Sequence, residues 1–297
     1  MTNNSNVIIG TWPLSGDFGA IDEFKTEELI NYSISKGFTE FDTAPNYGYG
    51  KIEEILSKTI KNYQTKFKIN TKCGNSRSGE KSFDTDDIKS SIDTSIDKFG
   101  TINTIFLHNP RDEVSSWTKL LRIINHYKEK NLVKFIGISL ARDYYIEDSI
   151  LNEFDYIQEE INLLCFENYF RIKKLSPKIM ARSPLASGIL SGKLSKKTKF
   201  SSKDHRSNWL NDERLKNILV QIDQVSKITD LNIKDFAQLF VLSLSSIDSI
   251  IYGIKSHDHV NQLLESNKKI LLKKEVLNNL FKMSKNNYNL DKGKKGY

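Results

Sequence analysis

In the stretch FTEFDTAPNY, residues 38–47, a short apolar run ends at the ionisable residue Asp42, and Tyr47 follows five residues later. Two later runs end in the same way, one at Lys72 and one at His108. Burying a charge costs several kcal/mol unless a partner or a function offsets that cost. Ionisable groups at the ends of these runs therefore predict a shared site for proton chemistry, and the chain is typical of an enzyme.

Short apolar runs alternate with longer amphipathic stretches along the chain, which is the pattern of a β/α protein. Eight such units, with no linker rich in Pro, Gly or Ser, favour one (β/α)₈ TIM barrel over residues 1–297 rather than a doubly wound sheet with a second domain. The predicted strands are Val7 to Ile9, Phe38 to Phe41, Phe67 to Asn70, Ile102 to Leu107, Val133 to Ile138, Tyr156 to Ile161, Ile179 to Ala181 and Ser249 to Tyr252.

Two of the intervening helices have clear ends in the sequence. Thr85 and Asp86 open a helix that Gly100 stops, and Asn131 stops the next one. Catalytic groups in (β/α)₈ barrels lie at the C-terminal ends of the strands. We therefore expect the polar residues at or just after the predicted strand ends to ring one mouth of the barrel: Asp42, Lys72, His108, Ser139, Gln158, Ser183 and Gly253.

Three segments lie outside the regular repeat. Residues 184–208 are rich in Ser, Gly and Lys and predict a mobile flap over the mouth. Residues 270–283 predict an extra C-terminal helix that packs across the barrel and covers its bottom, because only residues 1–6 precede the first strand. Residues 285–297 predict a flexible basic tail.

Charge and composition exclude several classes of protein. The formal net charge is +7, but the lysines are interspersed with acidic residues as on solvated helix faces, so we expect no nucleic-acid partner. Neither a membrane-spanning run nor a signal core is present, which predicts a soluble cytoplasmic protein with no membrane contact. Cys73 and Cys165 predict neither a disulfide nor a metal site. The excess positive charge favours phosphate-bearing ligands, and the oligomeric state stays open.

A longer motif around Asp42 resembles the signature of the aldo-keto reductase family. Residues 41–53, FDTAPNYGYGKIE, are similar to that family's Asp-Thr-Ala…Tyr-Gly…Glu pattern. Thr71-Lys72 and Leu107-His108-Asn109-Pro110 are similar to its other two catalytic motifs, in the same order. Further matching stretches lie at residues 137–139, 183–193 and 253–256, so the resemblance covers nearly the whole chain and implies the same barrel fold.

The resemblance implies an enzyme that reduces a carbonyl group in an aldehyde, ketone or sugar, with hydride from NADPH or NADH. Tyr47 would donate the proton, and the Lys72 ammonium beside it would lower the pKa of the phenol. Asp42 would pair with Lys72. His108 would hydrogen-bond the substrate oxygen and orient the carbonyl.

The resemblance also implies a set of cofactor contacts. Lys255 and Ser256, at the start of a helix, would bind the adenosine 2′-phosphate, which favours NADPH. Ser139 and Gln158 would hold the nicotinamide carboxamide. The full set is Thr11, Trp12, Ser139, Gln158, Arg182, Ser183, Leu185, Ser187, Gly253, Lys255, Ser256, His259 and Gln262.

Several positions depart from the family's usual residues. Leu140 stands where many members have Asn, and Arg182 stands where many members stack an aromatic ring on the nicotinamide. Leu263 stands where many members have an Asn that hydrogen-bonds the adenine. Together with His259 and Gln262, these departures leave the choice between NADPH and NADH open.

Other functions are compatible with the same barrel and the same candidate residues. One is a non-catalytic NADPH-binding regulatory subunit, as in the potassium-channel β subunits that resemble this family. Another is a sugar dehydrogenase that works in the oxidative direction. A third is an isomerase or aldolase barrel in which Lys72 forms a Schiff base. Nothing in the sequence identifies the substrate.

Overall fold

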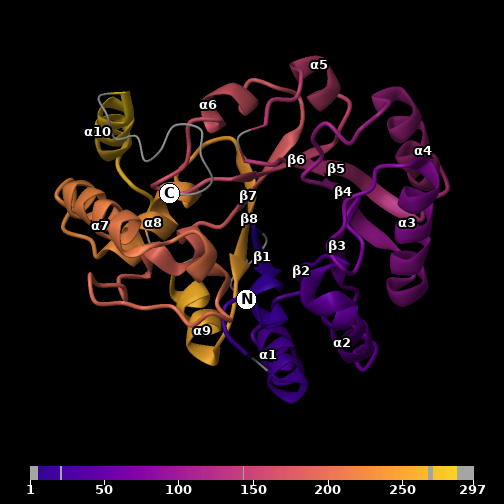
Figure 1. Cartoon of the computed structure of the whole chain (residues 1–297), viewed down its shortest axis with the longest axis horizontal. Coiled ribbons are helices and arrows are strands. Elements are labelled where there is room, and N and C mark those ends of the chain that lie inside the picture. Colours follow the sequence, from indigo (N-terminus) through magenta and orange to yellow (C-terminus); the bar gives the residue numbers. More distant parts are fainter. Residues whose placement is uncertain (1–5, 21, 143, 267–269, 286–297) are drawn as a thin grey trace.

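The computed structural model describes residues 6–20, 22–142, 144–266 and 270–285, and eight parallel strands form a closed barrel at its centre (Figure 1). Each strand pairs with the next, and β8 pairs with β1. The prediction of a (β/α)₈ barrel is confirmed, with strand ends that differ by no more than about three residues. The strands are β1 Val7–Gly10, β2 Glu40–Asp42, β3 Lys68–Cys73, β4 Ile102–His108, β5 Val133–Ser139, β6 Tyr156–Glu160, β7 Lys178–Arg182 and β8 Ile247–Gly253.

Helices surround the barrel (Figure 1). The predicted ends of α3 and α4 are confirmed: Gly100 follows α3 with a left-handed φ of 77°, and Asn131 follows α4 with a φ of 56°. A positive φ cannot continue a right-handed helix, so both residues act as stops. The helices are α1 Glu23–Ser35, α2 Lys51–Ile60, α3 Thr85–Phe99, α4 Trp117–Glu129, α5 Asp148–Leu151, α6 Tyr169–Ile172, α7 Asp212–Ser226, α8 Ile233–Leu242, α9 His257–Ser266 and α10 Lys274–Lys285.

Alternate residues of each strand point into the barrel, where they form a packed interior below the mouth. Phe106 of β4 is fully buried there, beside Gly137 of β5. A Cβ atom at residue 137 would overlap the Phe106 ring, so glycine is the residue that leaves room for it. Nearer the bottom, the rings of Phe135 and Tyr156 meet edge to face at 5.4 Å. Strand side chains therefore fill the lower barrel, which we had expected to need a cover.

The extra C-terminal helix is confirmed, but its predicted position across the barrel bottom was wrong. In α10, Phe281 meets Phe170 at 4.9 Å and Phe166 at 5.9 Å between ring centroids, and Leu280 is fully buried. These aromatic rings belong to α6 and to the segment before it, so α10 lies on the outside of the helical shell (Figure 1). Apolar contacts with the outer shell of helices, rather than with the barrel end, hold α10 in this position.

Beyond Lys285, the residues expected to form a basic tail lie outside the described part of the chain. Among the helices that the structure describes, none combines the length and the apolar character that a bilayer crossing requires.

The segment of residues 184–208 lies over the barrel mouth and contains more structure than its composition predicted. It holds two 3₁₀ turns, η3 Ala186–Ser191 and η4 His205–Asn208. Asp204 forms an isolated antiparallel bridge with Phe18, and the His205 amide donates to the Asp17 carbonyl at 2.6 Å. These contacts join the flap to the loop after β1, which carries the turn η1 Trp12–Ser15. Mobility of the flap stays a prediction.

Candidate active site

Lys72 is the centre of a buried polar cluster at the mouth of the barrel. Its side chain is 1% exposed, and its ammonium donates to Asp42 Oδ1 at 2.6 Å, to the Thr43 carbonyl at 2.7 Å and to the Tyr47 hydroxyl at 3.2 Å. Burial acts to lower the pKa of Lys72, but Asp42 and Tyr47 outweigh it and the pKa is raised. Lys72 is therefore a fixed ammonium ion that uses its three N–H groups on these partners.

Asp42 accepts hydrogen bonds at both of its carboxylate oxygens and at its backbone carbonyl. Its second oxygen accepts from Gln158 Nε2 at 2.8 Å, and Gln158 Oε1 in turn accepts from Ser139 Oγ at 3.1 Å. The Thr11 hydroxyl donates to the Asp42 backbone carbonyl at 2.9 Å. The strand order explains the proximity, because β5 pairs with β6 and places Ser139 opposite Gln158. Gln158 reaches across the barrel to Asp42, 116 residues away in the sequence.

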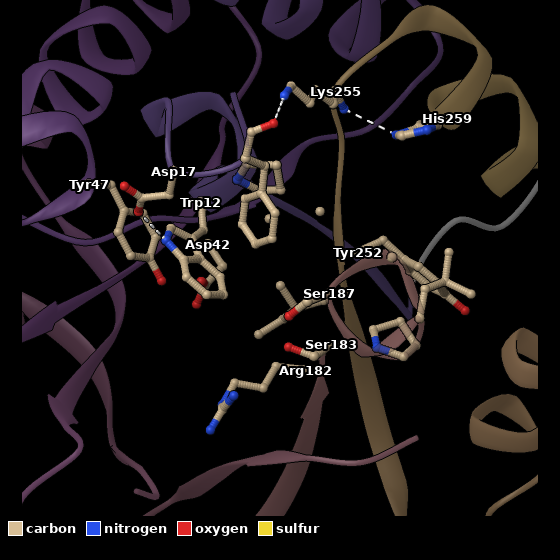
Figure 2. Close-up of a pocket in the computed structure, with 18 of the residues that line it drawn as sticks. Trp12, Asp17, Asp42, Tyr47, Arg182, Ser183, Ser187, Tyr252, Lys255 and His259 are labelled. Carbon is tan, nitrogen blue, oxygen red and sulfur yellow. Dashed lines mark hydrogen bonds between the residues drawn. The ribbon is translucent and has the colours of Figure 1, made fainter. Parts of the chain in front are cut away.

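Tyr47 lies in the turn η2 Tyr47–Gly50, and its hydroxyl points into the barrel mouth (Figure 2). The Trp12 ring stacks on it at a centroid distance of 6.4 Å, and His108 meets it edge to face at 6.3 Å. Burial raises the pKa of Tyr47 above its model-compound value of 10.0, with the Lys72 charge opposing the rise. Lys72 lowers this pKa as expected, but desolvation outweighs the ammonium and the pKa as a whole is raised. The phenol stays protonated at neutral pH.

His108 stands beside Tyr47 as a neutral imidazole. Burial holds its pKa well below 6.5, and the positive charges of Lys72, Arg182 and Lys81 lower it further. Asn75 Nδ2 lies 3.2 Å from His108 Nδ1 and donates to it. The proton of the neutral ring is thereby assigned to Nε2, so the ring can donate one hydrogen bond from that nitrogen.

The cluster forms part of the wall of a cavity of about 730 Å³ that runs from Tyr47 to α9 (Figure 2). Such a volume accommodates a large ligand. The loop after β1 and the flap close over it: the His205 ring lies 5.4 Å from the Trp12 ring and 5.8 Å from the Phe18 ring. The Arg206 guanidinium lies over the Phe18 ring and donates to the Ser187 carbonyl at 3.3 Å. The two loops therefore bridge part of the cavity, which has the form of a channel.

The start of the flap has an unusual backbone. Ser183, Ala186 and Ser187 adopt left-handed φ values of 55°, 49° and 54°, a region that non-glycine residues rarely occupy. Ser183 and Ser187 also line the cavity. Backbone strain of this kind collects at ligand-binding turns, which agrees with the predicted contacts of this motif.

The far end of the channel is cationic. Lys255 donates through its ammonium to the carbonyls of Phe18 and Gly19, the latter at 3.1 Å, and its side chain also lines the cavity. Burial lowers the pKa of Lys255, as it does that of His259, whose pKa Lys193 and Lys234 lower further. A group with several negative charges would relieve this repulsion.

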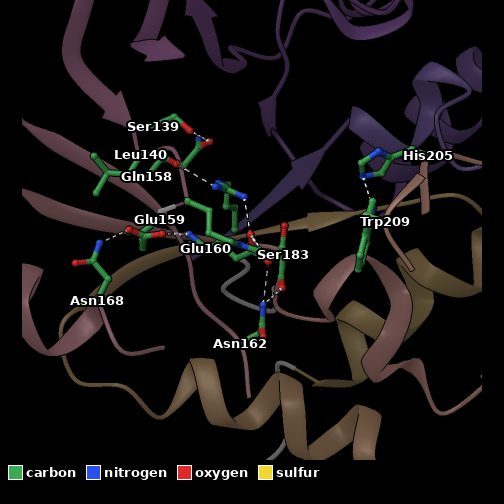
Figure 3. A network of polar contacts seen from close by, with 12 residues as sticks. Ser139, Leu140, Gln158, Glu159, Glu160, Asn162, Asn168, Ser183, His205 and Trp209 are labelled. Carbon is green, nitrogen blue, oxygen red and sulfur yellow. Dashed lines mark hydrogen bonds and ion pairs between the residues drawn. The ribbon is translucent and has the colours of Figure 1, made fainter. Parts of the chain in front are cut away.

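Arg182, at the end of β7, lines the channel together with Ser183 and Ser187 (Figure 2). Its guanidinium donates to Glu160 Oε2 at 3.2 Å and to the Leu140 carbonyl at 3.1 Å. Glu160 also pairs with Arg142. Figure 3 shows Glu160 beside Glu159 in the surrounding polar network. The side chain of Arg182 is 22% exposed to the channel.

The structure brings together most of the residues that the sequence singled out. Two do not line the cavity: Thr11 is buried beneath Asp42, and Ser256 lies at the start of α9, where its Oγ accepts from the His259 amide at 3.3 Å. Those that line the cavity are Asp42, Tyr47, Lys72, His108, Trp12, Ser139, Gln158, Arg182, Ser183, Leu185, Ser187, Gly253, Lys255, His259 and Gln262.

The sequence reasoning missed several residues of the cavity wall. Asn75 follows Lys72 by three residues, and its position just beyond a strand end was a signal that we did not use. Others lie in loops or on the side of a helix, where no periodic pattern marks them. They include Asp17, Phe18, Arg206, Lys234 and Gln238.

Comparison with known proteins fits this geometry. The model of the Aldo/keto reductase family matches residues 6–285. The chain belongs to the aldo/keto reductase family. Of the three positions noted as departures, Arg182 and Leu263 line the cavity, whereas the Leu140 carbonyl accepts a hydrogen bond from Arg182.

Relatives within the family share different amounts of the sequence. The chain is 43% identical to the aldo-keto reductase YhdN of Bacillus subtilis over 60 residues, which are 20% of this chain and 18% of YhdN. It is 28% identical to L-galactose dehydrogenase of Arabidopsis thaliana over 204 residues, 63% of each chain. The matches thus span less than two thirds of the length of either relative.

The fold is shared more widely than the sequence. The glycerol dehydrogenase of Gluconobacter oxydans superposes with a TM-score of 0.79 at 20% identity, covering 98% of this chain and 95% of its own. An aldo-keto reductase of Bacillus halodurans in its holo form superposes with a TM-score of 0.74 at 18% identity, covering 97% and 93%. At this level of identity the likeness concerns the barrel fold alone.

Proposed function

We propose that this protein is an NADPH-dependent oxidoreductase that reduces the carbonyl group of an aldehyde, ketone or sugar to an alcohol. The observation that carries the proposal is the contact of the Tyr47 hydroxyl with the Lys72 ammonium, beside a neutral His108. A phenol is a poor acid at neutral pH unless the phenolate is stabilised as it forms. An ammonium ion at 3.2 Å provides that stabilisation, and it is already in place before any ligand binds.

The proton chemistry follows from these three side chains. His108 donates from Nε2 to the carbonyl oxygen and orients it toward Tyr47. The Tyr47 hydroxyl gives its proton to the same oxygen as negative charge develops there, and Lys72 stabilises the resulting phenolate. Asp42 keeps Lys72 charged and fixed in direction. A bound nicotinamide cofactor would supply the hydride.

The channel fits such a cofactor in size and charge. Ser139 and Gln158 lie beside the catalytic cluster, where they would hold the nicotinamide end. Lys255, with Lys193 and Lys234 near His259, would bind the phosphates at the other end. Their combined charge favours NADPH over NADH, since NADPH carries the additional 2′-phosphate. Leu263 would contact the adenine through apolar packing instead of a hydrogen bond.

The Schiff-base alternative is disfavoured by the same geometry. A nucleophilic lysine must lose its proton, whereas Asp42 and Tyr47 raise the pKa of Lys72 against its burial. Borohydride treatment in the presence of a carbonyl substrate should therefore leave Lys72 unmodified.

The test is NADPH oxidation at pH 7 against a panel of neutral aldehydes and ketones, with Tyr47→Phe beside the parent. We expect the variant to lose at least ~100-fold in turnover, as for removal of a general acid. Tyr49→Phe is the matched control, because Tyr49 belongs to the same turn and is 77% exposed. Cofactor binding without turnover of any carbonyl would instead favour a regulatory subunit. Turnover of sugars or polyols with NADP⁺ alone would favour a dehydrogenase.

A further inference from the structure

His108 suits the proposed reaction in only one of its two neutral forms. A neutral imidazole carries its proton on either Nδ1 or Nε2, and the nitrogen without a proton accepts hydrogen bonds instead of donating them. Because Nδ1 faces Asn75 at 3.2 Å, the ring has only Nε2 left with which to donate to a carbonyl oxygen. The reaction therefore depends on a group that keeps the proton of His108 on Nε2.

A short hairpin, residues 74–82, follows β3 and carries Asn75. Gly74 turns the chain with a φ of 97°, and a Cβ atom at this residue would meet the Phe83 ring at 2.4 Å. Asn75 and Lys81 then face each other as an isolated antiparallel bridge. Since β3 pairs with β4, the hairpin lies beside the end of the strand that carries the histidine.

Lys81 joins this hairpin to the loop after β4. Its ammonium donates to the Asn109 carbonyl at 3.0 Å and lies 3.6 Å from the Glu113 carboxylate. Asn109 directly follows His108 in the chain. The hairpin and the end of β4 are therefore joined at a second point besides the contact of Asn75 with the imidazole, and this second contact limits how far the two side chains can separate.

The Asn75 amide is not explained by packing. The residue is 9% exposed, and its Nδ2 donates to His108. Its Oδ1 is also buried and has no hydrogen-bond partner among the described residues. A buried oxygen without a partner lowers stability, and such atoms are uncommon in native proteins. An apolar side chain would fill the same space without that penalty, so the contribution of the amide lies in its N–H group on His108.

The charges around His108 keep the ring neutral. Lys72 of β3, Lys81 of the hairpin and Arg182 of β7 all lower its pKa in addition to burial. The Tyr47 ring meets the imidazole edge to face at 6.3 Å. In a ring that does not gain a second proton, the remaining variable is the nitrogen that carries the first one. An uncharged amide donor sets that position without changing the charge of the site.

We propose that Asn75 is a positioning residue for His108, whose ring proton its amide N–H keeps on Nε2. The inference rests on the proposed reductase function, because that function gives His108 its role as a donor to the substrate carbonyl. Asn75 acts through the imidazole, and the hairpin with Lys81 holds it there. The segment of residues 72–75 thus serves both acids: Lys72 stabilises the phenolate of Tyr47, and Asn75 orients the second donor.

Asn75→Asp reverses the contact with almost no change of side-chain shape. A carboxylate has no N–H group, so it accepts from Nδ1–H and should move the ring proton from Nε2 to Nδ1. Nitrogen-15 NMR of protein labelled at its five histidines distinguishes the two tautomers, and His108→Gln identifies the signals of this ring. At pH 9 we expect Nε2–H in the parent and Nδ1–H in Asn75→Asp. The measurement requires neither substrate nor cofactor.

The pH dependence of kcat/KM for a neutral aldehyde gives the functional readout. The introduced carboxylate should raise the pKa of His108, so lowering the pH adds a proton and restores Nε2–H. We expect Asn75→Asp to be about 100-fold below the parent at pH 9, as for the loss of one donor to the developing charge, and to recover in part toward pH 6.5. Asn75→Leu introduces no charge and fixes neither tautomer, so its loss should be smaller, about 10-fold, and independent of pH.

Asn103→Asp is the matched control. The Asn103 side chain donates to Asn70 Oδ1 at 2.8 Å near the start of β4, so the substitution exchanges a hydrogen-bonded amide for a carboxylate on the same strand pair but at the opposite end. It should leave both the tautomer of His108 and the shape of the pH profile as they are in the parent.

The outcomes separate this inference from the proposed function. Nε2–H in Asn75→Asp, or a pH profile in that variant with the parent's shape, would overturn the inference. If Asn75→Asp does not fold, Asn75→Leu decides: a mixture of tautomers supports the role of Asn75, and Nε2–H alone contradicts it. A parent that shows the expected tautomers but turns over no carbonyl would remove the reductase proposal, while Asn75 would still be the residue that sets the proton of His108.

Discussion

The two halves of the barrel mouth differ in how their charged groups are paired. On the β2–β4 side, the Lys72 ammonium donates to both Asp42 and Tyr47, and Asn75 donates to the His108 ring. On the β7–β8 side and under the flap, Arg182 and the lysines near His259 face the channel as cations. The chemical half is therefore pre-organised before a ligand arrives, whereas the binding half depends on the ligand's charge for completion.

The largest expected effect, on both stability and activity, comes from removing the ion pair between Lys72 and Asp42. Lys72→Met leaves the Asp42 carboxylate buried without its charge partner, which should cost about 3–5 kcal/mol in the free energy of unfolding. The loss of phenolate stabilisation should also lower kcat/KM by roughly 10²- to 10³-fold. Urea unfolding and NADPH oxidation measure the two effects separately.

Lys98→Met is the matched control for that experiment. Lys98 pairs with the fully buried Glu53 at 2.6 Å, away from the channel, so it reproduces the loss of a buried ion pair without touching the cluster. It should lower stability but leave the kcat of the folded enzyme unchanged. Equal losses of kcat in both variants would mean that Lys72 acts through stability alone.

A smaller effect, on cofactor affinity, should follow from removing one cation of the binding half. Lys255→Gln should weaken NADPH binding by about 10-fold, because one charge-assisted contact to the 2′-phosphate is lost from a partly exposed site. NADH, which lacks that phosphate, should change by much less. Dissociation constants from protein fluorescence quenching give the ratio.

The comparison of the two cofactors controls for a structural effect of the same substitution. Lys255 also holds the carbonyls of Phe18 and Gly19, so loosening of that loop would weaken both cofactors alike. Lys178→Gln, at the bottom of the barrel, should change neither. A parallel loss for NADPH and NADH would remove Lys255 from the proposed phosphate site.

The smallest expected change is in the pH dependence of reduction. Tyr47 donates its proton below its raised pKa, which lies above 10.0, and His108 is neutral above its pKa, which lies well below 6.5. Both side chains are therefore in their active form from pH 6.5 to 9, and kcat/KM with a neutral aldehyde should be flat across that window. An inflection that His108→Gln abolishes would show that the imidazole titrates within it.

His108 should also affect the free energy of unfolding in acid. Its folded pKa is depressed, so below pH 6.5 the unfolded chain binds a proton that the folded chain does not. Stability should fall as the pH drops below 6.5, by up to about 1.4 kcal/mol per pH unit from this group. Urea midpoints at pH 7.5 and 5.5 should differ less in His108→Gln than in the parent.

The sequence was sufficient for the barrel and for the chemical half of the mouth. A buried parallel strand is a continuous apolar run, and its end is marked when the run stops at Asp42 or His108. Those marks fall on strands whose order around the barrel is fixed by topology, so their proximity could be predicted. The direction of the Tyr47 pKa could not, because it depends on how much burial outweighs the Lys72 charge.

The binding half was less predictable for a physical reason. Arg206 and Asp17 reach the channel from loops, whose paths follow contacts such as the bridge between Phe18 and Asp204 rather than a repeating pattern. The position of α10 was missed because an amphipathic helix reveals that one face is buried but not which surface buries it.

The pairing of Gly137 with Phe106 inside the barrel constrains how this chain can change. Any side chain added at residue 137 enters space that the Phe106 ring occupies, so such a change is tolerated only together with a smaller residue at 106. Substituted variants of the lower barrel should therefore be sought as exchanges at two neighbouring strands, β4 and β5, rather than at single positions. In directed evolution of this protein, variants with a reshaped barrel interior beneath His108 should therefore carry substitutions at residues 106 and 137 together.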